Sequence, residues 1–303
     1  MVNTKVVVGK LSLKNPVMTA SGTFGFGSEM ARVLDLGRLG ACVVKSTSKE
    51  ARVGNATPRV VETSSGILNA IGLQNGGVEN FINEKLPFLR TVDTPIVVNI
   101  VGNDVSEYVY LAQRLSDVEG VDALEINISC PNVKHGCDFS VDANLTSELV
   151  SEVRKVTALT LITKLSPNVT DIVSIGRAAV EAGSDALSLI NTLVGTAIDA
   201  KKRKFRLANI TGGLSGPAIK PVALRLVWQV HQALPSVPLI GMGGISSATD
   251  AIEFLLAGAT AVAVGTSTFV TPTSVIEIID GIEDYMTTYG VADVNELIGA
   301  VTR

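Results

Sequence analysis

Eight short runs of aliphatic residues recur along the 303-residue chain, and the intervals between them carry polar turns and apolar patterns of helical period. The runs are nearly continuously hydrophobic, which is typical of parallel strands covered on both faces. We predict strands at residues 16–20, 41–45, 95–100, 123–127, 161–165, 186–190, 238–241 and 261–265. This alternation is the sequence sign of repeated βαβ units and constrains the fold more than any other feature.

Helical patterns fall between the strands. They are predicted at residues 78–89, 105–116, 144–157, 169–182, 221–234 and 248–257. Ser246 and Ser247 supply capping hydroxyls before the last of these helices. Gly183 and Gly258 follow helical runs and are expected to end them in the left-handed conformation.

Eight such units joined by right-handed crossovers most simply close into an α/β fold of the (β/α)8 TIM-barrel type. Barrels of about 250 residues commonly form one domain, so we expect a single domain over residues 1–303. A short N-terminal strand hairpin should precede the barrel. An open doubly wound sheet is the alternative fold, but the sequence lacks an early GxGxxG motif.

Two segments are longer than an ordinary βα loop: residues 46–76 after the second strand and residues 191–220 after the sixth. Extra chain at the carboxyl ends of barrel strands is where binding sites are built. The second segment contains a basic run at residues 201–204, which we interpret as a solvated loop or hairpin tip. We expect Trp228, on the helix that follows, to pack in the core or an interface.

Composition excludes several classes of protein. With 25 Lys and Arg against 29 Asp and Glu, the formal net charge is −4, which argues against binding nucleic acid by general electrostatics. No apolar run approaches the roughly 20 residues of a membrane-spanning helix. Three cysteines without CxxC spacing and two histidines support neither a disulfide framework nor a Cys/His metal site. A cytoplasmic protein is therefore expected.

Residues 127–132 read Asn-Ile-Ser-Cys-Pro-Asn and begin where the fourth strand should end. A thiol, a hydroxyl and two carboxamides at a barrel mouth suit a planar polar ligand and one proton transfer. Near its reference pKa of about 8.5, Cys130 would be a few per cent thiolate at pH 7, as for a base that works better as the pH rises. The alternative is a buried cysteine that acts only as a small apolar residue. His135, a few residues on, is expected on the loop surface.

Other predicted strands also end in polar residues, namely Lys45, Ser46, Asn99, Lys164, Asn191 and Thr192. A lysine at the end of an apolar strand is costly to bury unless it meets an anion or an acceptor. The seventh and eighth strands are followed by Gly-rich turns, at residues 241–245 and 265–266. This position is the recurrent phosphate site of barrel enzymes. A further Gly-rich loop at residues 210–218 could lie flat against a ligand.

Four longer motifs resemble those of soluble dihydroorotate dehydrogenases. They are LNAIGLQN at 68–75, NISCPNVKHG at 127–136, KLSPNVTDI at 164–172 and NITGGLSGPAIKP at 209–221. The similarity runs from about residue 5 to near the C-terminus. Cysteine at position 130, where membrane-bound relatives carry serine, resembles class 1. The Asn-Ala-Ile-Gly-Leu and Ile-Asn-Thr-Leu stretches resemble the B type, whose catalytic subunit passes electrons through an iron–sulfur flavoprotein to NAD⁺.

The resemblance implies a barrel that binds FMN and oxidises dihydroorotate to orotate in pyrimidine (UMP) synthesis. Cys130 would remove the C5 proton while C6 gives hydride to flavin N5, and Lys164 would lie near the flavin N1/O2 edge. Positions that match FMN contacts are Ser21, Lys45, Ser46, Asn99, Asn127, Lys164, Ile190, Gly216, Gly243, Gly244, Gly265 and Thr266. Positions that match substrate contacts are Lys45, Asn69, Ala70, Ile71, Gly72, Leu73, Asn127, Asn191 and Thr192, with Asn132 added.

For assembly, the resemblance implies a homodimer within a heterotetramer, with FAD and a 2Fe-2S cluster in two electron-transfer subunits. Three alternatives stay open from the residues. The first is an A-type homodimer that reduces fumarate, and the second is a flavin-free lyase or isomerase that uses the Gly loops for a phosphorylated substrate. The third is a non-enzymatic binding subunit, against which the converging Lys, Asn and Cys residues argue.

Overall fold

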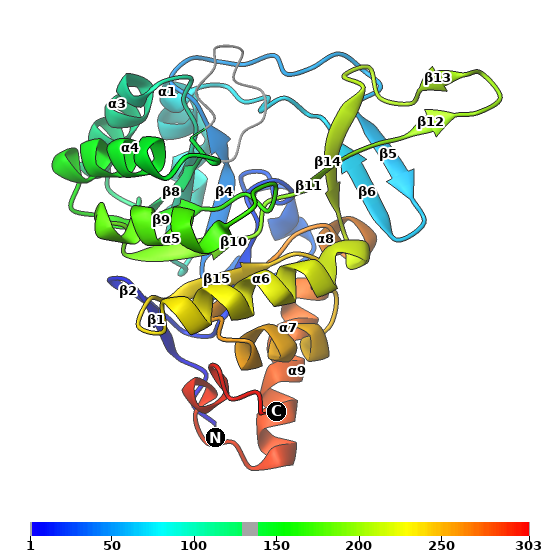
Figure 1. The fold of residues 1–303 in the computed structure, drawn as a ribbon. Helices are drawn as coiled ribbons and strands as arrows, with labels where there is room; N and C mark the ends of the chain where they lie inside the picture. Colours follow the sequence, from blue (N-terminus) through cyan, green and yellow to red (C-terminus); the bar gives the residue numbers. More distant parts are fainter. Residues whose placement is uncertain (1, 129–138, 303) are drawn as a thin grey trace.

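A computed structural model describes residues 2–128 and 139–302 of the chain (Figure 1). Its centre is a parallel sheet with the strand order β3-β16-β15-β10-β9-β8-β7-β4. The strands are β3 (Val17–Thr19), β4 (Cys42–Thr47), β7 (Ile96–Ile100), β8 (Ala123–Asn127), β9 (Thr160–Lys164), β10 (Ala186–Leu189), β15 (Leu239–Met242) and β16 (Ala261–Val264). Each predicted strand coincides with one of these within two residues at either end.

The two ends of this sheet meet and close the barrel. Met18 and Ala41 form a parallel bridge, and the Thr19 backbone N–H donates to the Ala41 carbonyl at 3.4 Å. The Thr19 hydroxyl also donates to the Val43 carbonyl at 3.1 Å. The predicted (β/α)8 TIM barrel is therefore confirmed, and the open doubly wound sheet is excluded.

Helices cover the outside of the barrel (Figure 1). The long ones are α3 (Val105–Ser116), α4 (Ala143–Val156), α5 (Ile172–Glu181), α6 (Lys220–Ala233), α7 (Ala248–Leu256) and α9 (Ser274–Tyr289). The predicted helix at 78–89 is a continuous run of α1 (Val78–Asn80), the π-helical η3 (Phe81–Lys85) and α2 (Leu86–Leu89). The short α8 (Ser267–Val270) and α9 were not predicted.

The first connection is not a full strand–helix unit, which corrects the count of eight. Between β3 and β4 lie only the 3-10 turns η1 (Met30–Arg32) and η2 (Leu36–Arg38). Glycines recur at positions 22, 25 and 27 of this connection, and each one lowers helix propensity. The predicted helix ends are confirmed elsewhere, since Ser247 forms a capping box with Asp250, and Gly183 and Gly258 have φ of 110° and 114°.

An N-terminal hairpin precedes the barrel, as predicted. Strands β1 (Val6–Val8) and β2 (Leu11–Leu13) pair antiparallel. The Lys10 backbone N–H donates to the Thr160 hydroxyl at 2.9 Å. Because Thr160 begins β9, the hairpin lies against the amino end of the barrel, opposite the end where the polar strand termini gather.

The two long insertions fold onto each other as one antiparallel sheet beside the barrel (Figure 1). Its order is β11-β14-β6-β5, from β5 (Val60–Thr63), β6 (Gly66–Asn69), β11 (Leu193–Thr196) and β14 (Thr211–Ser215). Val61, Leu68, Ala70 and Leu207 form a small core under it. The basic run at 201–204 lies at the exposed tip of the β12 (Ile198–Asp199) and β13 (Lys204–Phe205) hairpin, which confirms its interpretation.

One packing prediction is wrong in part. Trp228 on α6 is 43% exposed, so it is not a core residue. It lies one position after Val227 and two before Val230, the residues that face the barrel from this helix. A single apolar cluster otherwise unites strands and helices throughout the barrel. The 3-10 turn η5 (Val294–Leu297) completes the fold, and no helix within the described ranges has the length and hydropathy to cross a membrane.

Asp250 joins the amino ends of α6 and α7. Its carboxylate accepts a hydrogen bond from Lys220 Nζ at 2.6 Å, and others at 2.9 Å from the backbone N–H and hydroxyl groups of Ser246 and Ser247. Burial acts to raise the pKa of this carboxyl, but the hydrogen bonds outweigh burial and hold the pKa at about 2. The folded pKa thus lies below the ordinary value.

Because the folded pKa is depressed, the stability contributed by Asp250 should be complete above about pH 4 and lost as the pH falls toward about 2. Asp250→Asn should lower the free energy of unfolding by about 1–2 kcal/mol at pH 7 and flatten its dependence on pH in that window. Urea denaturation at a series of pH values measures both effects. Glu253→Gln is the matched control, since Glu253 also binds Lys220, at 2.8 Å, but is more exposed. Identical pH slopes for wild type and Asp250→Asn would contradict this role.

Candidate active site

The carboxyl ends of the barrel strands bring predicted site residues together across the barrel interior. Lys164, the last residue of β9, is only 5% exposed, and its Nζ lies 3.3 Å from the Ser21 hydroxyl. Three strands separate β9 from β3 in the sheet, so this contact crosses the inside of the barrel. Ser21 and Lys164 therefore face the same interior space.

A buried carboxylate that the sequence analysis missed lies among these side chains. Glu125 on β8 accepts hydrogen bonds from Asn99 Nδ2 at 2.5 Å and from the Ser188 hydroxyl at 2.7 Å. Its Oε2 lies 3.9 Å from Lys164 Nζ. The available signal was an acid in an otherwise apolar stretch, Ala-Leu-Glu-Ile, which a barrel interior does not accept without partners.

Asn99 presents an acceptor that has no partner among the described residues. The residue on β7 is fully buried, and its Oδ1 has no hydrogen-bond partner in the described part of the chain, while Nδ2 donates to Glu125. A buried carbonyl oxygen left without a donor costs free energy. The arrangement suits a ligand that brings an N–H group to this position.

Lys45 and Ser46 lie near the carboxyl end of β4, where the pairing with β7 is irregular. Burial lowers the pKa of Lys45, and the positive charge of Arg59 lowers it further. Within the described ranges no carboxylate lies within ion-pair distance of Lys45, and neither residue hydrogen-bonds to another predicted site side chain. An anionic ligand would supply the partner that Lys45 lacks there.

The paired insertions bring the predicted substrate residues into contact. Asn69 Nδ2 donates to the Gly213 carbonyl at 3.3 Å, and a Cβ on Gly213 would lie 2.0 Å from the Thr192 hydroxyl. Asn69 and Thr192, on different insertions, thus lie on either side of one backbone segment. Gly72 and Leu73 have φ of 75° and 56°, so the loop that follows adopts the left-handed conformation. Such a turn in a non-Gly residue is uncommon and often marks a ligand site.

Ala70 and Ile71 are held by Asn55. The Asn55 side chain donates to the Ala70 carbonyl at 3.0 Å, and its backbone N–H donates to Ile71 at 3.0 Å. The ends of β8 and β10 are held in the same way, because the Tyr108 hydroxyl donates to Asn127 at 2.7 Å and the Asn191 N–H donates to Leu165 at 3.0 Å.

Three glycine-containing segments converge beyond β14, β15 and β16. A Cβ on Gly244 would lie 3.0 Å from the Gly216 carbonyl, and one on Gly216 would lie 3.5 Å from Thr266 Cγ2. Gly243 and Gly244 have φ of 128° and 79°. The Thr266 hydroxyl donates to Ser215 at 2.8 Å, and Gly265 directly follows β16. Ile190 joins this edge, since its N–H donates to Met242 at 3.0 Å.

Two predicted residues, Cys130 and Asn132, lie outside the described residues, as does His135. Their predicted roles stay predictions. No group of three or more His, Cys, Asp or Glu that would suit a metal ion occurs in the described part of the chain.

Comparison with known proteins identifies the family. The model of the family described as dihydroorotate dehydrogenase matches residues 1–286. The chain belongs to the dihydroorotate dehydrogenase family. It is 60% identical over 297 residues to a protein of Geotalea daltonii, covering 98% of this chain and 97% of the other. It is 56% identical over 299 residues to a protein of Desulforamulus reducens, covering 98% of each. Both relatives are named dihydroorotate dehydrogenase B (NAD(+)), catalytic subunit.

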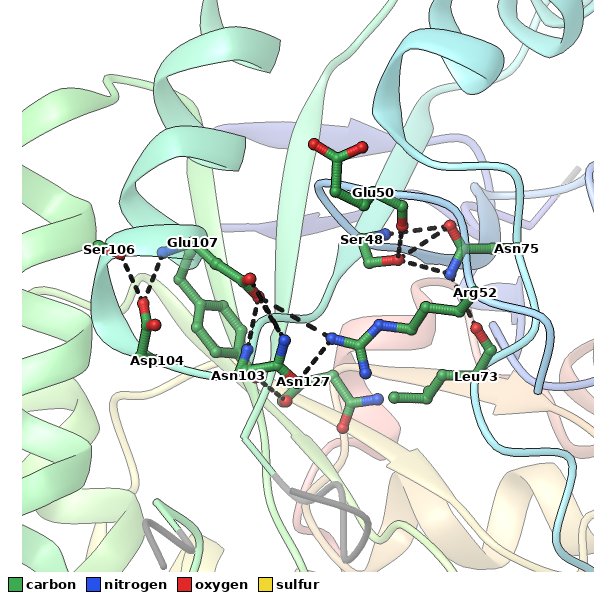
Figure 2. Close-up of polar contacts among 11 residues, drawn as sticks. Ser48, Glu50, Arg52, Leu73, Asn75, Asn103, Asp104, Ser106, Glu107 and Asn127 are labelled. Carbon is green, nitrogen blue, oxygen red and sulfur yellow. Dashed lines mark hydrogen bonds and ion pairs between the residues drawn. The ribbon is translucent and has the colours of Figure 1, made fainter. Parts of the chain in front are cut away.

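The site of this family member has a polar border that the sequence analysis also missed (Figure 2). Arg52 donates to Asn103 Oδ1 at 3.0 Å and lies 3.9 Å from Glu107 Oε2. Ser48 and Asn75 hydrogen-bond through their side chains at 2.8 Å, and Asn75 Nδ2 also donates to the Leu73 carbonyl at 2.8 Å. These contacts attach the loop carrying Leu73 to the barrel. Most of these contacts join residues that are far apart in the sequence, so no local motif predicts them.

The segments that converge at Gly216, Gly244 and Thr266, which we call the cradle, predict that position 244 requires glycine. A Cβ there would lie 2.9 Å from the Lys220 backbone N, and its φ disfavours any L side chain. Gly244→Ala should therefore lower the free energy of unfolding by about 1–2 kcal/mol. Gly22→Ala, at another turn where no atom lies within 4 Å of the added Cβ, is the control and should change it by less than about 0.5 kcal/mol. Urea denaturation compares them, and equal losses would count against the cradle geometry.

Proposed function

We propose that this chain oxidises (S)-dihydroorotate to orotate in pyrimidine (UMP) biosynthesis, as a catalytic subunit linked to NAD⁺. The observation that carries the proposal is identity of 54–60% over nearly the whole chain to proteins named dihydroorotate dehydrogenase B (NAD(+)), catalytic subunit. The barrel-mouth lysines and carboxamides supply the donors that a small planar anion with a carboxylate and imide edges requires.

FMN is the cofactor we assign to the single barrel domain of residues 1–303. The Asn99 oxygen, which has no partner among the described residues, would accept from an N–H group of the flavin ring, and the buried Lys164 ammonium group would lie at the edge of that ring. Ser21, Ser46, Asn127 and Ile190 complete the ring site. The converging segments at Gly216, Gly243, Gly244, Gly265 and Thr266 suit the phosphate, because backbone N–H groups without Cβ atoms in the way bind phosphate well.

The substrate site we propose joins the two insertions to the barrel. Its residues are Lys45, Asn69, Ala70, Ile71, Gly72, Leu73, Asn127, Asn132, Asn191 and Thr192. Lys45 would bind the substrate carboxylate, which explains a half-buried lysine without an acidic neighbour in the described ranges. The carboxamides would hold the imide edges, because each offers both a donor and an acceptor.

Cys130 is the base we propose for the C5 proton of dihydroorotate. Asn127 is the last residue of β8, and Cys130 follows it by three positions in the sequence. A bound FMN would supply the acceptor for the hydride that leaves C6. Lys164 would lie beside the N1/O2 edge of the ring and stabilise the negative charge that reduction brings there. Cys42, a second cysteine, is buried in the barrel wall. Burial raises the pKa of its thiol to about 12, so it cannot serve as the base at neutral pH.

The subunit name of the relatives implies an electron-transfer partner. We propose a partner iron–sulfur flavoprotein with FAD and a 2Fe-2S cluster, and a heterotetramer of two such subunits on a homodimer of this chain. A cytoplasmic location stays a prediction.

The first test is the visible spectrum of the purified, desalted chain before and after anaerobic addition of dihydroorotate. We expect a flavin band that bleaches. A band that does not bleach would reject the substrate, and no flavin after reconstitution with FMN would reject the cofactor and favour the phosphorylated-substrate alternative. Fumarate and NAD⁺ are then added to the isolated chain, which should reduce neither efficiently. Rapid reduction of fumarate would instead indicate the A type.

Cys130→Ser should retain FMN but lose about 10²- to 10⁴-fold in the rate of flavin reduction at pH 7, because a far smaller fraction of a serine hydroxyl than of a cysteine thiol is deprotonated at that pH. Stopped-flow absorbance under anaerobic conditions measures this rate. Cys42→Ala is the matched control, since it removes a thiol from outside the site and should leave the rate unchanged. Reduction of the Cys130→Ser flavin at the wild-type rate would contradict the assignment.

A further inference from the structure

The Glu125 carboxylate lies among residues of the proposed flavin site and has partners on three different strands. Asn99 on β7 and Ser188 on β10 both donate to it, at 2.5 and 2.7 Å, and Lys164 on β9 lies 3.9 Å away. Strand β9 separates β8 from β10, so the bond to Ser188 passes over β9 inside the barrel. The carboxylate therefore lies in the interior, with its two oxygens bound in different directions.

Both charged groups of this arrangement are buried. Glu125 is 2% exposed and Lys164 is 5% exposed, so water does not screen either group. A buried ion pair is tolerated when hydrogen bonds satisfy its remaining atoms, whereas removal of one partner leaves an uncompensated charge. Here Asn99 and Ser188 satisfy the carboxylate, and the ammonium group has Ser21 as its other partner at 3.3 Å. The Lys164 charge is thus partly balanced before any ligand enters.

We infer that Glu125 is a positioning residue that sets both the orientation of Asn99 and the positive charge available from Lys164 to the flavin. This inference rests on the proposed function. With Nδ2 held by Glu125, the Asn99 amide has to turn Oδ1 toward the ligand. The same carboxylate opposes part of the Lys164 charge that would stabilise a reduced, negatively charged flavin. Glu125 would accordingly lower the reduction potential of a bound flavin.

Glu125→Gln isolates the charge, because glutamine keeps the shape and the acceptor for Asn99, and the Ser188 hydroxyl can reverse its hydrogen bond. We expect the variant to bind FMN and to shift the two-electron equilibrium about tenfold toward reduced flavin, or about +30 mV. Anaerobic titration against a reference dye measures the potential. Ser188→Ala is the matched control, because it removes one hydrogen bond of the same network and leaves the charge in place. It should shift the equilibrium by less than about threefold.

The outcomes separate the two proposals. A wild-type chain that binds no FMN overturns the proposed function and this inference together. A wild-type chain that binds FMN and is reduced by dihydroorotate, with an unchanged or lowered potential in Glu125→Gln, overturns this inference alone. An equal rise of the flavin potential in Ser188→Ala would also overturn this inference, since the rise would then follow from disruption of the hydrogen-bond network and not from loss of the Glu125 charge.

If Glu125→Gln does not fold or hold FMN, the paired variant Glu125→Gln/Lys164→Gln decides the question by comparison with Lys164→Gln. Lys164→Gln leaves the buried carboxylate without its cation, while the paired variant leaves no buried charge. We expect the paired variant to have the higher melting temperature without FMN and the higher flavin potential. A Lys164→Gln protein that equals or exceeds the paired variant in both measurements overturns the inference.

Discussion

Closure of the parallel barrel is the constraint on which the site depends. Parallel strands carry all their carboxyl ends to one edge, and the Met18–Ala41 bridge turns that edge into a ring. Groups from β9 and from the end of β3, 143 residues apart, can then meet across the interior, as Lys164 and Ser21 do. In an open sheet of the same strand order, three strands would separate these two groups.

The interior of this ring is polar where an ordinary barrel layer is apolar. The interior polar residues hold one another in the centre, namely Asn99, Glu125, Lys164 and Ser188. Within residues 2–128 and 139–302, the buried Asn99 oxygen has no donor. Such a network costs desolvation energy unless it is satisfied, so a packed apolar layer would serve stability better. Its presence is explained by a ligand that completes it. The network therefore ties the energetics of the fold to the proposed binding of FMN.

The insertions complete the site from outside the barrel. Pairing of β14 with β6 places Gly213 opposite Asn69. Gly216, which directly follows β14 of the same sheet, lies close to Gly244. The proposed substrate and phosphate regions are thus linked through one small antiparallel sheet. Arg52, Ser48 and Asn75 fix the loop between them to the barrel side (Figure 2). A change in this sheet would reach both regions at once, because it shares backbone with each.

The sequence alone determined the strand positions, the barrel and the polar residues at the strand ends, because hydrophobic periodicity and turn residues act over a few neighbouring positions. Its motifs also indicated the family. Only the tertiary structure decided that β6 pairs with β14, that the first connection lacks an α-helix and that Trp228 faces outward. It alone revealed Glu125, whose partners Asn99 and Ser188 lie 26 and 63 residues away. Contacts at such separations are set by barrel closure and burial, which leave no local signal in the chain.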